Sequence, residues 1–251
     1  MCGIVGVASS SEEYKSRLYE ACKLLTHRGP DTSGIWWSKD GHVGLGHRRL
    51  SIIDLSSKAN QPMELISKNS LIITFNGEIY NHKSLKQRLQ KKGYNFRSNS
   101  DTEVILAAYD HWGKCCVEYF EGAFSFVIYD IKKKILFIAR DRAGEKPLFF
   151  SRTGKRFIFA SEIKSLIELD DNLRTINSKS LSQYLYQGFV GKKNCILKDV
   201  HKLESGNHLI YDIESKEIKV HRYWKVNQKR DLCYDEDYIS KNIIRLLKDS
   251  I

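Results

Sequence analysis

The residue with the most reactive chemistry in this chain is a cysteine directly after the initiator methionine. Cys2 becomes the N-terminal residue once Met1 is removed, and its small side chain should permit that removal. It then carries a nucleophilic thiol and a free α-amine, whose unperturbed pKa of about 7.7–8.0 suits proton transfer near neutral pH. Nucleophile and base would be one residue. Taken alone, Cys2 is better explained as an ordinary cysteine in a terminal strand, because free cysteine often packs as a small apolar residue.

Two further segments combine reactive side chains with a local pattern that has an ordinary explanation. Residues 27–31 (HRGPD) break a helix with Gly and Pro and are either a plain turn or a functional loop. Arg49 lies between apolar strand residues, where a guanidinium is costly to bury unless it meets an anion. The alternative is an arginine that points to solvent from an edge strand.

A strand-like run from residue 71 to 81 contains Asn76 and Gly77, and Asn-Gly between apolar runs is a strong hairpin signal. A helical pattern starts at once after it, however, so no strand returns. Asn76 and Gly77 are therefore free to act as hydrogen-bond donors. Asp101 stands at a helix start and has a complete explanation there as an N-cap or first-turn acid.

Composition predicts a soluble chain with one large domain or two small ones. Of the 251 residues, 41% are hydrophobic and 28% charged, enough to bury a substantial core. No segment approaches membrane-spanning length, and no basic stretch precedes the apolar start as in a signal peptide. We expect a cytoplasmic protein without a membrane partner.

The charge distribution argues against a nucleic-acid-binding protein, and the cysteine spacing argues against a disulfide framework and a metal site. The net charge of +11 is spread along the chain without a nucleic-acid-binding signature, so we expect no nucleic-acid partner. The cysteines form no CxxC pair and no metal-ligand spacing, so we expect neither a disulfide framework nor a metal site. They are Cys2, Cys22, Cys115, Cys116, Cys195 and Cys233.

Periodicity predicts an α+β fold, because hairpins and helices come in groups with no β-α-β alternation. Helices are expected at 11–25, 82–93, 101–112, 162–169, 180–187 and 235–251, with Cys22 in the core. Strands are expected at 3–7, 43–54, 71–81, 124–130, 135–141, 147–152, 156–160, 208–212 and 217–221.

The last helix is amphipathic, with Ile239, Ile243, Leu246 and Leu247 on one stripe. The sequence stops inside this pattern, which suggests that another unit begins there. We therefore expect one domain over residues 1–225, followed by a linker and the first helix of a second domain over 226–251.

Taken together, the motifs resemble the glutaminase domain of glutamine-dependent asparagine synthetases. The likeness covers nearly the whole chain and places it among class II glutamine amidotransferases, which are N-terminal-nucleophile hydrolases. The matching segments, in order, are residues 1–6 (MCGIVG), 27–31 (HRGPD), 49–52 (RLSI), 76–81 (NGEIYN), 100–103 (SDTE), 120–124 (FEGAF), 140–148 (RDRAGEKPL) and 161–164 (SEIK).

The resemblance implies a fold and a reaction. Two antiparallel β-sheets would be sandwiched between helices, in an αββα arrangement. Cys2 would attack the side-chain amide of L-glutamine, with its own α-amine as base, giving a thioester and ammonia, and water would then release glutamate. Asn76 and Gly77 would form the oxyanion hole.

Substrate-binding residues follow from the same resemblance. Arg49 would hold the α-carboxylate of glutamine, because its planar guanidinium suits a carboxylate. The backbone of Leu50, Ser51, Ile52 and Ile53 would assist it. Glu78 and Asp101 would hold the α-ammonium.

The resemblance also implies a partner. Ammonia would pass to an asparagine synthetase-type domain, in cis or in trans, for ATP-dependent amidation of aspartate or a related carboxylate. The glutaminase reaction needs no cofactor and no metal; ATP and Mg²⁺ would act only in the synthetase domain, whose Ser-Gly-Gly pyrophosphate loop is missing from this sequence. A homodimer is possible.

Some observations leave other functions open. Residues 191–196 and 202–206 depart from the usual pattern of these synthetases, which bears on the partner or acceptor served. One alternative is a non-catalytic module of the same fold that binds glutamine or docks a partner. Another is a hydrolase of the same type acting on a different amide, although Arg49 with Asp101 favours an α-amino-acid substrate.

Overall fold

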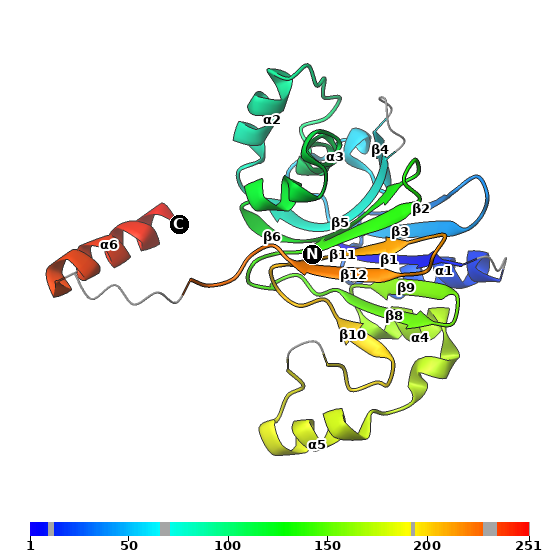
Figure 1. Cartoon of the computed structure of the whole chain (residues 1–251). Coiled ribbons are helices and arrows are strands. Elements are labelled where there is room, and N and C mark those ends of the chain that lie inside the picture. The colour runs from blue at the N-terminus through cyan, green and yellow to red at the C-terminus, as the bar shows by residue number, and fades with distance from the viewer. Residues whose placement is uncertain (10–12, 66–70, 192–193, 228–234, 251) are drawn as a thin grey trace.

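Two antiparallel β-sheets lie face to face at the centre of the molecule (Figure 1). The computed structural model describes residues 1–9, 13–65, 71–191, 194–227 and 235–250. Both sheets combine hairpins with pairings between segments that are distant in the sequence. The hairpins predicted at 124–141 and 147–160 are among them. The α+β sandwich expected from the sequence is confirmed.

The first sheet is centred on the N-terminal strand. Strand β1 pairs with β3 on one side and with β9 on the other, both antiparallel. Because β1 is central and helices cover the outer face, every residue from Gly3 to Ala8 is buried, which explains its uninterrupted apolar run. In spatial order the strands are β10 (Val200–Lys202), β8 (Phe149–Thr153), β9 (Arg156–Ala160), β1 (Gly3–Ala8), β3 (Val43–Arg49) and β2 (Thr32–Trp37).

The second sheet has two long central strands that pair along their whole length. Strand β5 pairs with β6 from Leu71 opposite Asp130 to Ile79 opposite Gly122. Its other edge is covered only at the start, by the short strand β4. In spatial order the strands are β12 (Ile218–Arg222), β11 (Asn207–Asp212), β7 (Ile135–Arg140), β6 (Gly122–Asp130), β5 (Leu71–Ile79) and β4 (Met63–Leu65).

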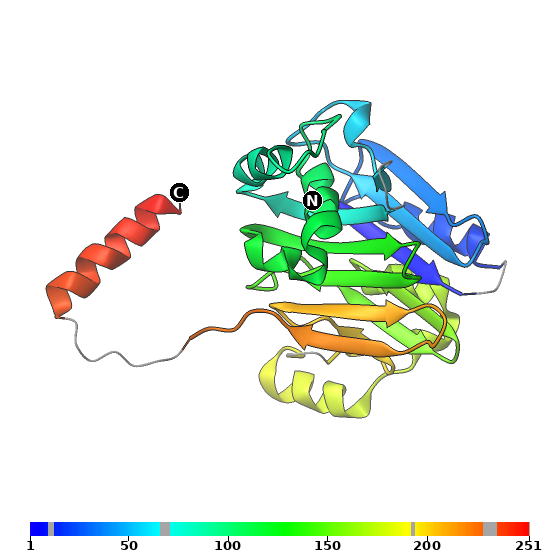
Figure 2. The same cartoon turned by 45° about the horizontal axis from the view of Figure 1, so that its top comes forward.

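Three apolar clusters hold the layers together. One lies between the sheets and includes Ile4, Leu45 and Ile72. The second joins the outer face of the second sheet to α2 (His82–Gln90) and α3 (Asp101–Trp112). The third joins the first sheet to α1 (Tyr14–Lys23) and α4 (Ile163–Leu169), and buries Cys22 as predicted. Figure 1 shows this order of helices, sheets and helices, and Figure 2 shows the green helices in front of the second sheet.

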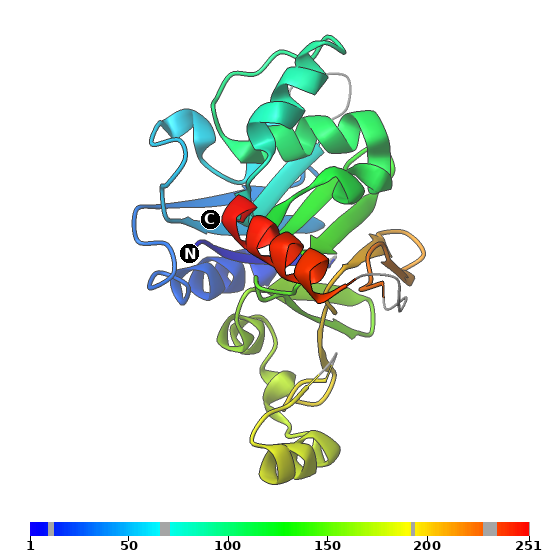
Figure 3. The same ribbon diagram turned by 90° about the vertical axis from the view of Figure 1, so that its left-hand side faces the viewer.

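Two helices extend beyond this sandwich. Helix α5 (Ser178–Gln187) lies at one end of the molecule, beside α4 and β10. Helix α6 (Glu236–Asp249) begins at the cap Asp235, whose side chain accepts from the Tyr238 N–H. No residue of α6 is buried, and it lies apart from the sandwich in Figures 1 and 2. Figure 3 views the molecule from that side, so α6 (red) is drawn in front of the sheets. Its predicted stripe, including Ile243 and Leu247, is therefore exposed. The predicted boundary at residues 225 and 226 stays a prediction.

Several predicted element ends were wrong. The strand predicted over 43–54 ends at Arg49, and residues 50–56 form a loop instead. Strands β2, β4 and β10 were not predicted. The Asn76-Gly77 pair forms no hairpin turn, because both residues lie inside β5 and pair with Ser125 and Phe124.

Among the residues that the structure describes, no helix combines the length and apolar character needed to cross a bilayer.

Candidate active site

The predicted site residues meet where the two sheets face each other, at one end of the sandwich. In the first sheet, Gly3 pairs with Arg48 and Ile4 with His47, so continuing this register places Cys2 opposite Arg49. Alternate residues of a strand share a face, and Ile4 faces the second sheet. Cys2 and Arg49 therefore face the second sheet as well. There Ile72 and Asn76 share the face that points back.

One pocket contains all the predicted site residues except Ser51. The Ser51 N–H instead donates to Asp31 Oδ2 at 2.7 Å, which ties the loop after β3 to the 27–31 segment. Further residues that sequence reasoning did not single out for the site line it too, among them Gln61 and Lys146. The predicted residues in the lining are Cys2, Arg49, Leu50, Ile52, Ile53, Asn76, Gly77, Glu78 and Asp101.

The Cys2 thiol is held by the backbone of the loop that follows β3. The Leu50 N–H donates to Sγ at 3.4 Å, and Sγ lies 3.6 Å from the Leu50 carbonyl oxygen. Burial raises the pKa of the Cys2 thiol, and this effect outweighs the opposing ones of the Leu50 N–H and the Arg49 charge. The thiol is therefore protonated near neutral pH, so its use as a nucleophile requires a base.

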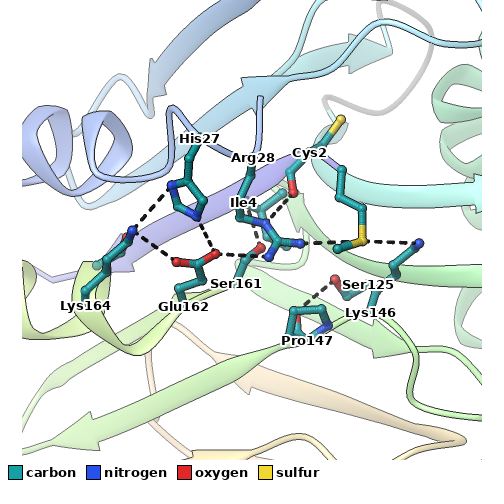
Figure 4. A network of polar contacts seen from close by, with 12 residues as sticks. Cys2, Ile4, His27, Arg28, Ser125, Lys146, Pro147, Ser161, Glu162 and Lys164 are labelled. Carbon is teal, nitrogen blue, oxygen red and sulfur yellow. Dashed lines mark hydrogen bonds and ion pairs between the residues drawn. The ribbon is translucent and has the colours of Figure 1, made fainter. Parts of the chain in front are cut away.

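A charged network fixes the backbone around Cys2 on the side away from the thiol (Figure 4). Arg28 Nε donates to the Cys2 carbonyl oxygen at 2.9 Å, and Arg28 Nη1 donates to Glu162 at 3.1 Å. His27 and Lys164 also contact Glu162, at 2.8 and 3.3 Å. Burial raises the pKa of Glu162, but hydrogen bonds from these three partners leave it below the ordinary value. The predicted HRGPD segment thus anchors the start of β1.

Asn76 carries an amide without a partner in the core of the protein. Its side chain is 0% exposed, and neither Oδ1 nor Nδ2 forms a hydrogen bond within the described part of the chain. Leaving such a group unpaired costs about 1–3 kcal/mol. A polar ligand in the pocket would satisfy it. An unpaired buried donor beside a thiol suits stabilisation of a developing oxyanion.

The edge of β5 presents backbone N–H groups to the pocket in regular steps of two residues. The Phe75 N–H donates to Gln61 Oε1 at 2.7 Å, and the Ile79 N–H donates to Asp101 Oδ2 at 3.0 Å. The Gly77 N–H lies between these two and points to the same edge, because N–H groups of alternate residues share an edge. A side chain at Gly77 would lie 2.2 Å from the Ala123 carbonyl oxygen, so only glycine fits here.

Arg49 explains why the predicted strand stops. Its Nη1 donates to the carbonyl oxygen of Ser56 at 3.0 Å and to Asn60 Oδ1 at 2.7 Å, and Nη2 donates to the carbonyl oxygen of Asp54. The loop therefore wraps around the guanidinium instead of continuing β3. Five N–H donors exist on this group. Within the described residues these bonds leave Nε–H and one Nη2–H, and the Nε–Nη2 edge of a guanidinium can bind a carboxylate through two hydrogen bonds.

Two acidic residues, Glu78 and Asp101, also line the pocket. Asp101 is 5% exposed at the first turn of α3, after the N-cap Ser100. Burial raises the pKa of Asp101, and the nearby Glu78 raises it further. A bound ammonium group would favour the ionised form of both side chains. Within the described residues no group of three or more His, Cys, Asp or Glu side chains could hold a metal ion.

The comparison that decides the family is a match over residues 1–224 to the family model described as "Glutamine amidotransferase domain". The chain belongs to the glutamine amidotransferase domain family. This confirms the resemblance on which the site prediction was based.

Curated relatives of this amidotransferase chain carry synthetase names. A Methanocaldococcus jannaschii protein named putative asparagine synthetase [glutamine-hydrolyzing] 2 is 35% identical, over 100% of this chain and 52% of its own length. Bacillus subtilis asparagine synthetase [glutamine-hydrolyzing] 1 is also 35% identical, over 100% of this chain and 39% of its own length. The chain thus spans about half or less of the length of these relatives.

A solved structure shares the amidotransferase fold at lower sequence identity. It is the Bacillus subtilis glutamine phosphoribosylpyrophosphate amidotransferase complexed with ADP and GMP, with a TM-score of 0.67 and 21% identity. The match covers 89% of this chain and 49% of that chain. At this identity the likeness concerns the sandwich alone.

Proposed function

We propose that this chain hydrolyses L-glutamine to glutamate and ammonia. The observation that carries the proposal is the composition of one pocket. The Cys2 thiol and the unpaired Asn76 amide lie in it together with Arg49 and the acids Glu78 and Asp101. An α-amino acid would place its carboxylate on Arg49 and its ammonium on the acids. Its side-chain amide would then reach the thiol.

The reaction follows from the groups present. The α-amine of Cys2, freed by loss of Met1, takes the thiol proton as Sγ bonds to the amide carbon of glutamine. The Asn76 Nδ2–H and Gly77 N–H donate to the oxygen that becomes negative. The carbon–nitrogen bond then breaks, the amine returns its proton to the leaving nitrogen, and ammonia and a thioester result. Water hydrolyses the thioester, releasing glutamate and the thiol.

The proposal includes a destination for ammonia. Since the relatives are longer and carry synthetase names, we propose that a synthetase domain, in cis or in trans, uses ammonia to amidate aspartate or a related carboxylate. ATP and Mg²⁺ would bind there, and glutamine hydrolysis would need no cofactor. Residues 226–251 would start this domain, whose surface would cover the α6 stripe. We also propose that the protein is cytoplasmic and that it forms a homodimer.

The test is a paired assay on residues 1–251. Glutamate and ammonia should appear with glutamine as substrate, whereas no asparagine should form with glutamine, aspartate, ATP and Mg²⁺. Glutamine binding without turnover would support a non-catalytic module instead. Faster cleavage of an amide that lacks the α-carboxylate and α-ammonium would support a different amidohydrolase.

Arg49→Lys should raise the KM for glutamine about 10–100-fold and change kcat by only a few-fold. Lysine keeps the charge but loses the two-donor edge, and a hydrogen bond to a charged group contributes about 1.5–3 kcal/mol. The contact exists in the ground state and in the transition state, so the loss falls on KM. Steady-state kinetics measure the change in KM. Arg48→Lys is the control, because Arg48 lies on the opposite face of β3. An equal KM change in both variants would contradict the role of Arg49.

Asp101→Asn should stabilise the fold while weakening glutamine binding. The folded-state pKa of Asp101 is raised, so its ionisation opposes folding. This destabilisation is absent below the pKa that Asp101 has in the unfolded chain. It grows as the pH rises from the unfolded to the folded pKa and is complete above the folded pKa. Asparagine keeps an acceptor for the Ile79 N–H without the charge. Urea unfolding between pH 4 and 8 should show a gain that grows with pH, beside a higher KM. A variant less stable than the parent at pH 8 would refute this account.

A further inference from the structure

The backbone of Phe75 in β5 is held by side chains where a neighbouring strand would normally hold it. Strand β4 pairs with β5 only from Leu71 to Ile73, so the edge of β5 is uncovered at Phe75. There Gln61 Oε1 accepts from the Phe75 N–H at 2.7 Å, and His47 Nε2 lies 3.0 Å from the Phe75 carbonyl oxygen. Both polar groups of Phe75 are therefore fixed, one residue before Asn76.

His47 contacts this carbonyl as a neutral donor. It is 0% exposed, and burial lowers its pKa to about 3. Since a carbonyl oxygen only accepts, Nε2 carries the proton, and Nδ1 is the unprotonated nitrogen. Nδ1 has no hydrogen-bond partner within the described residues. A buried imidazole held in one tautomer, with one nitrogen unpaired, suggests that the donor function of Nε2 is what the position requires.

The contact also joins the two halves of the site. His47 belongs to β3 of the first sheet and pairs with Ile4, two residues from Cys2. Phe75 belongs to the second sheet and precedes the proposed oxyanion donors. The His47–Phe75 contact thus connects the strands that carry the thiol and the donors. Catalysis by positioned groups is sensitive to shifts of about 1 Å, which cost roughly 10²-fold in rate.

We propose that His47 and Gln61 are positioning residues, which fix the backbone C=O and N–H of Phe75 so that Asn76 and Gly77 donate to the oxyanion formed at Cys2. The inference rests on the proposed glutamine hydrolysis and adds to it. Neither side chain takes part in proton transfer. His47 acts only through the Phe75 carbonyl. Gln61 accepts from the N–H of the same residue, in the preceding peptide group, and donates through Nε2 to Thr102 Oγ1 at 3.1 Å, which ties it to α3.

A neighbouring contact provides a matched control. Thr74 Oγ1 donates to the Gly46 carbonyl oxygen at 3.1 Å, so it joins the same two strands one residue away. The Thr74 side chain forms no hydrogen bond to the Phe75 backbone within the described residues. Thr74→Val keeps the shape of this side chain and removes the bond between the sheets. If His47 only stabilised the packing of the sheets, the two positions would respond alike.

The experiment compares His47→Met, His47→Gln and Thr74→Val in residues 1–251. Methionine fills the space without a donor, whereas glutamine offers an amide N–H at a similar reach. His47→Met should lower kcat about 10–100-fold with little change in KM, and His47→Gln should recover most of it. Thr74→Val should keep kcat within about threefold. Gln61→Leu should lower kcat as His47→Met does. Gln61→Glu keeps an acceptor for the Phe75 N–H, so its kcat should fall less.

Amide hydrogen exchange gives a second readout that needs no turnover. Exchange at Phe75 and Gly77 should be faster in His47→Met than in Thr74→Val, at equal global stability. A parent chain without glutaminase activity would refute the proposed function, and the exchange comparison would then decide the inference alone. Equal exchange in the two variants would overturn it. An effect of His47→Met confined to KM would also overturn the inference. The same loss of kcat in Thr74→Val would overturn it too.

Discussion

Cys2→Ala is expected to remove glutamine hydrolysis to the background of the assay, while the protein stays folded. The thiol is the nucleophile of the proposed reaction, and no other described cysteine lines the pocket. Alanine is smaller, so glutamine should still bind to Arg49 and the acids. Glutamate release measures the loss, and calorimetric titration with glutamine should show retained binding. Substantial turnover in this variant would refute the thioester mechanism.

The amine half of the mechanism has its own control. Inserting a lysine between Met1 and Cys2 should prevent methionine removal and leave the thiol in an internal residue. Because general acid–base catalysis contributes about 10²–10⁴-fold, activity should fall by that factor. Intact-mass spectrometry should show loss of Met1 in the parent and its retention in the variant. Full activity with Met1 retained would exclude the α-amine as the base.

Asn76→Ala should lower kcat about 10²–10³-fold and leave the KM for glutamine within a few-fold. The lost donor acts on charge that develops only in the transition state, so substrate binding is spared. The substitution also removes a buried amide that has no partner in the described structure, so stability should not fall by the usual cost of a lost hydrogen bond.

The contrast with Arg49→Lys makes the Asn76 prediction specific. Steady-state kinetics on both variants should place one loss in kcat and the other in KM. Thermal unfolding of Asn76→Ala should show a midpoint near that of the parent, which separates a catalytic effect from misfolding. Two variants with the same kinetic pattern would show that the proposed division between binding and oxyanion stabilisation is wrong.

Local patterns were sufficient for most of the regular elements. Helix α3 was predicted over residues 101–112 because a cap, an apolar stripe and Gly113 mark its ends, and the structure has it at Asp101–Trp112. The hairpin of β6 and β7 follows from two apolar runs around residues 131–134. Strand β2 was missed because Thr32–Trp37 has no clear alternation and none of its residues is buried.

The site was less accessible to sequence reasoning, because its geometry depends on contacts between distant segments. Nothing local indicates that Arg49 ends β3 by binding the carbonyl groups of Asp54 and Ser56. Nor does the pattern around Gln61 indicate that its side chain replaces a missing strand beside Phe75. The resemblance supplied the residues of the pocket, whereas only the fold shows how the two sheets bring them together.

The central place of β1 has a consequence for how the protein is made. Its neighbours are β3 and β9, and the Ile4 carbonyl accepts from Ser161, 157 residues later. At about 5–20 residues per second, β9 leaves the ribosome roughly 8–30 s after the N-terminus. Throughout this interval β1 lacks one of its partners, so we expect its first residues to be open to an aminopeptidase. The free thiol and amine of the proposed mechanism would then be generated during synthesis, before the sheet that will hold them is complete.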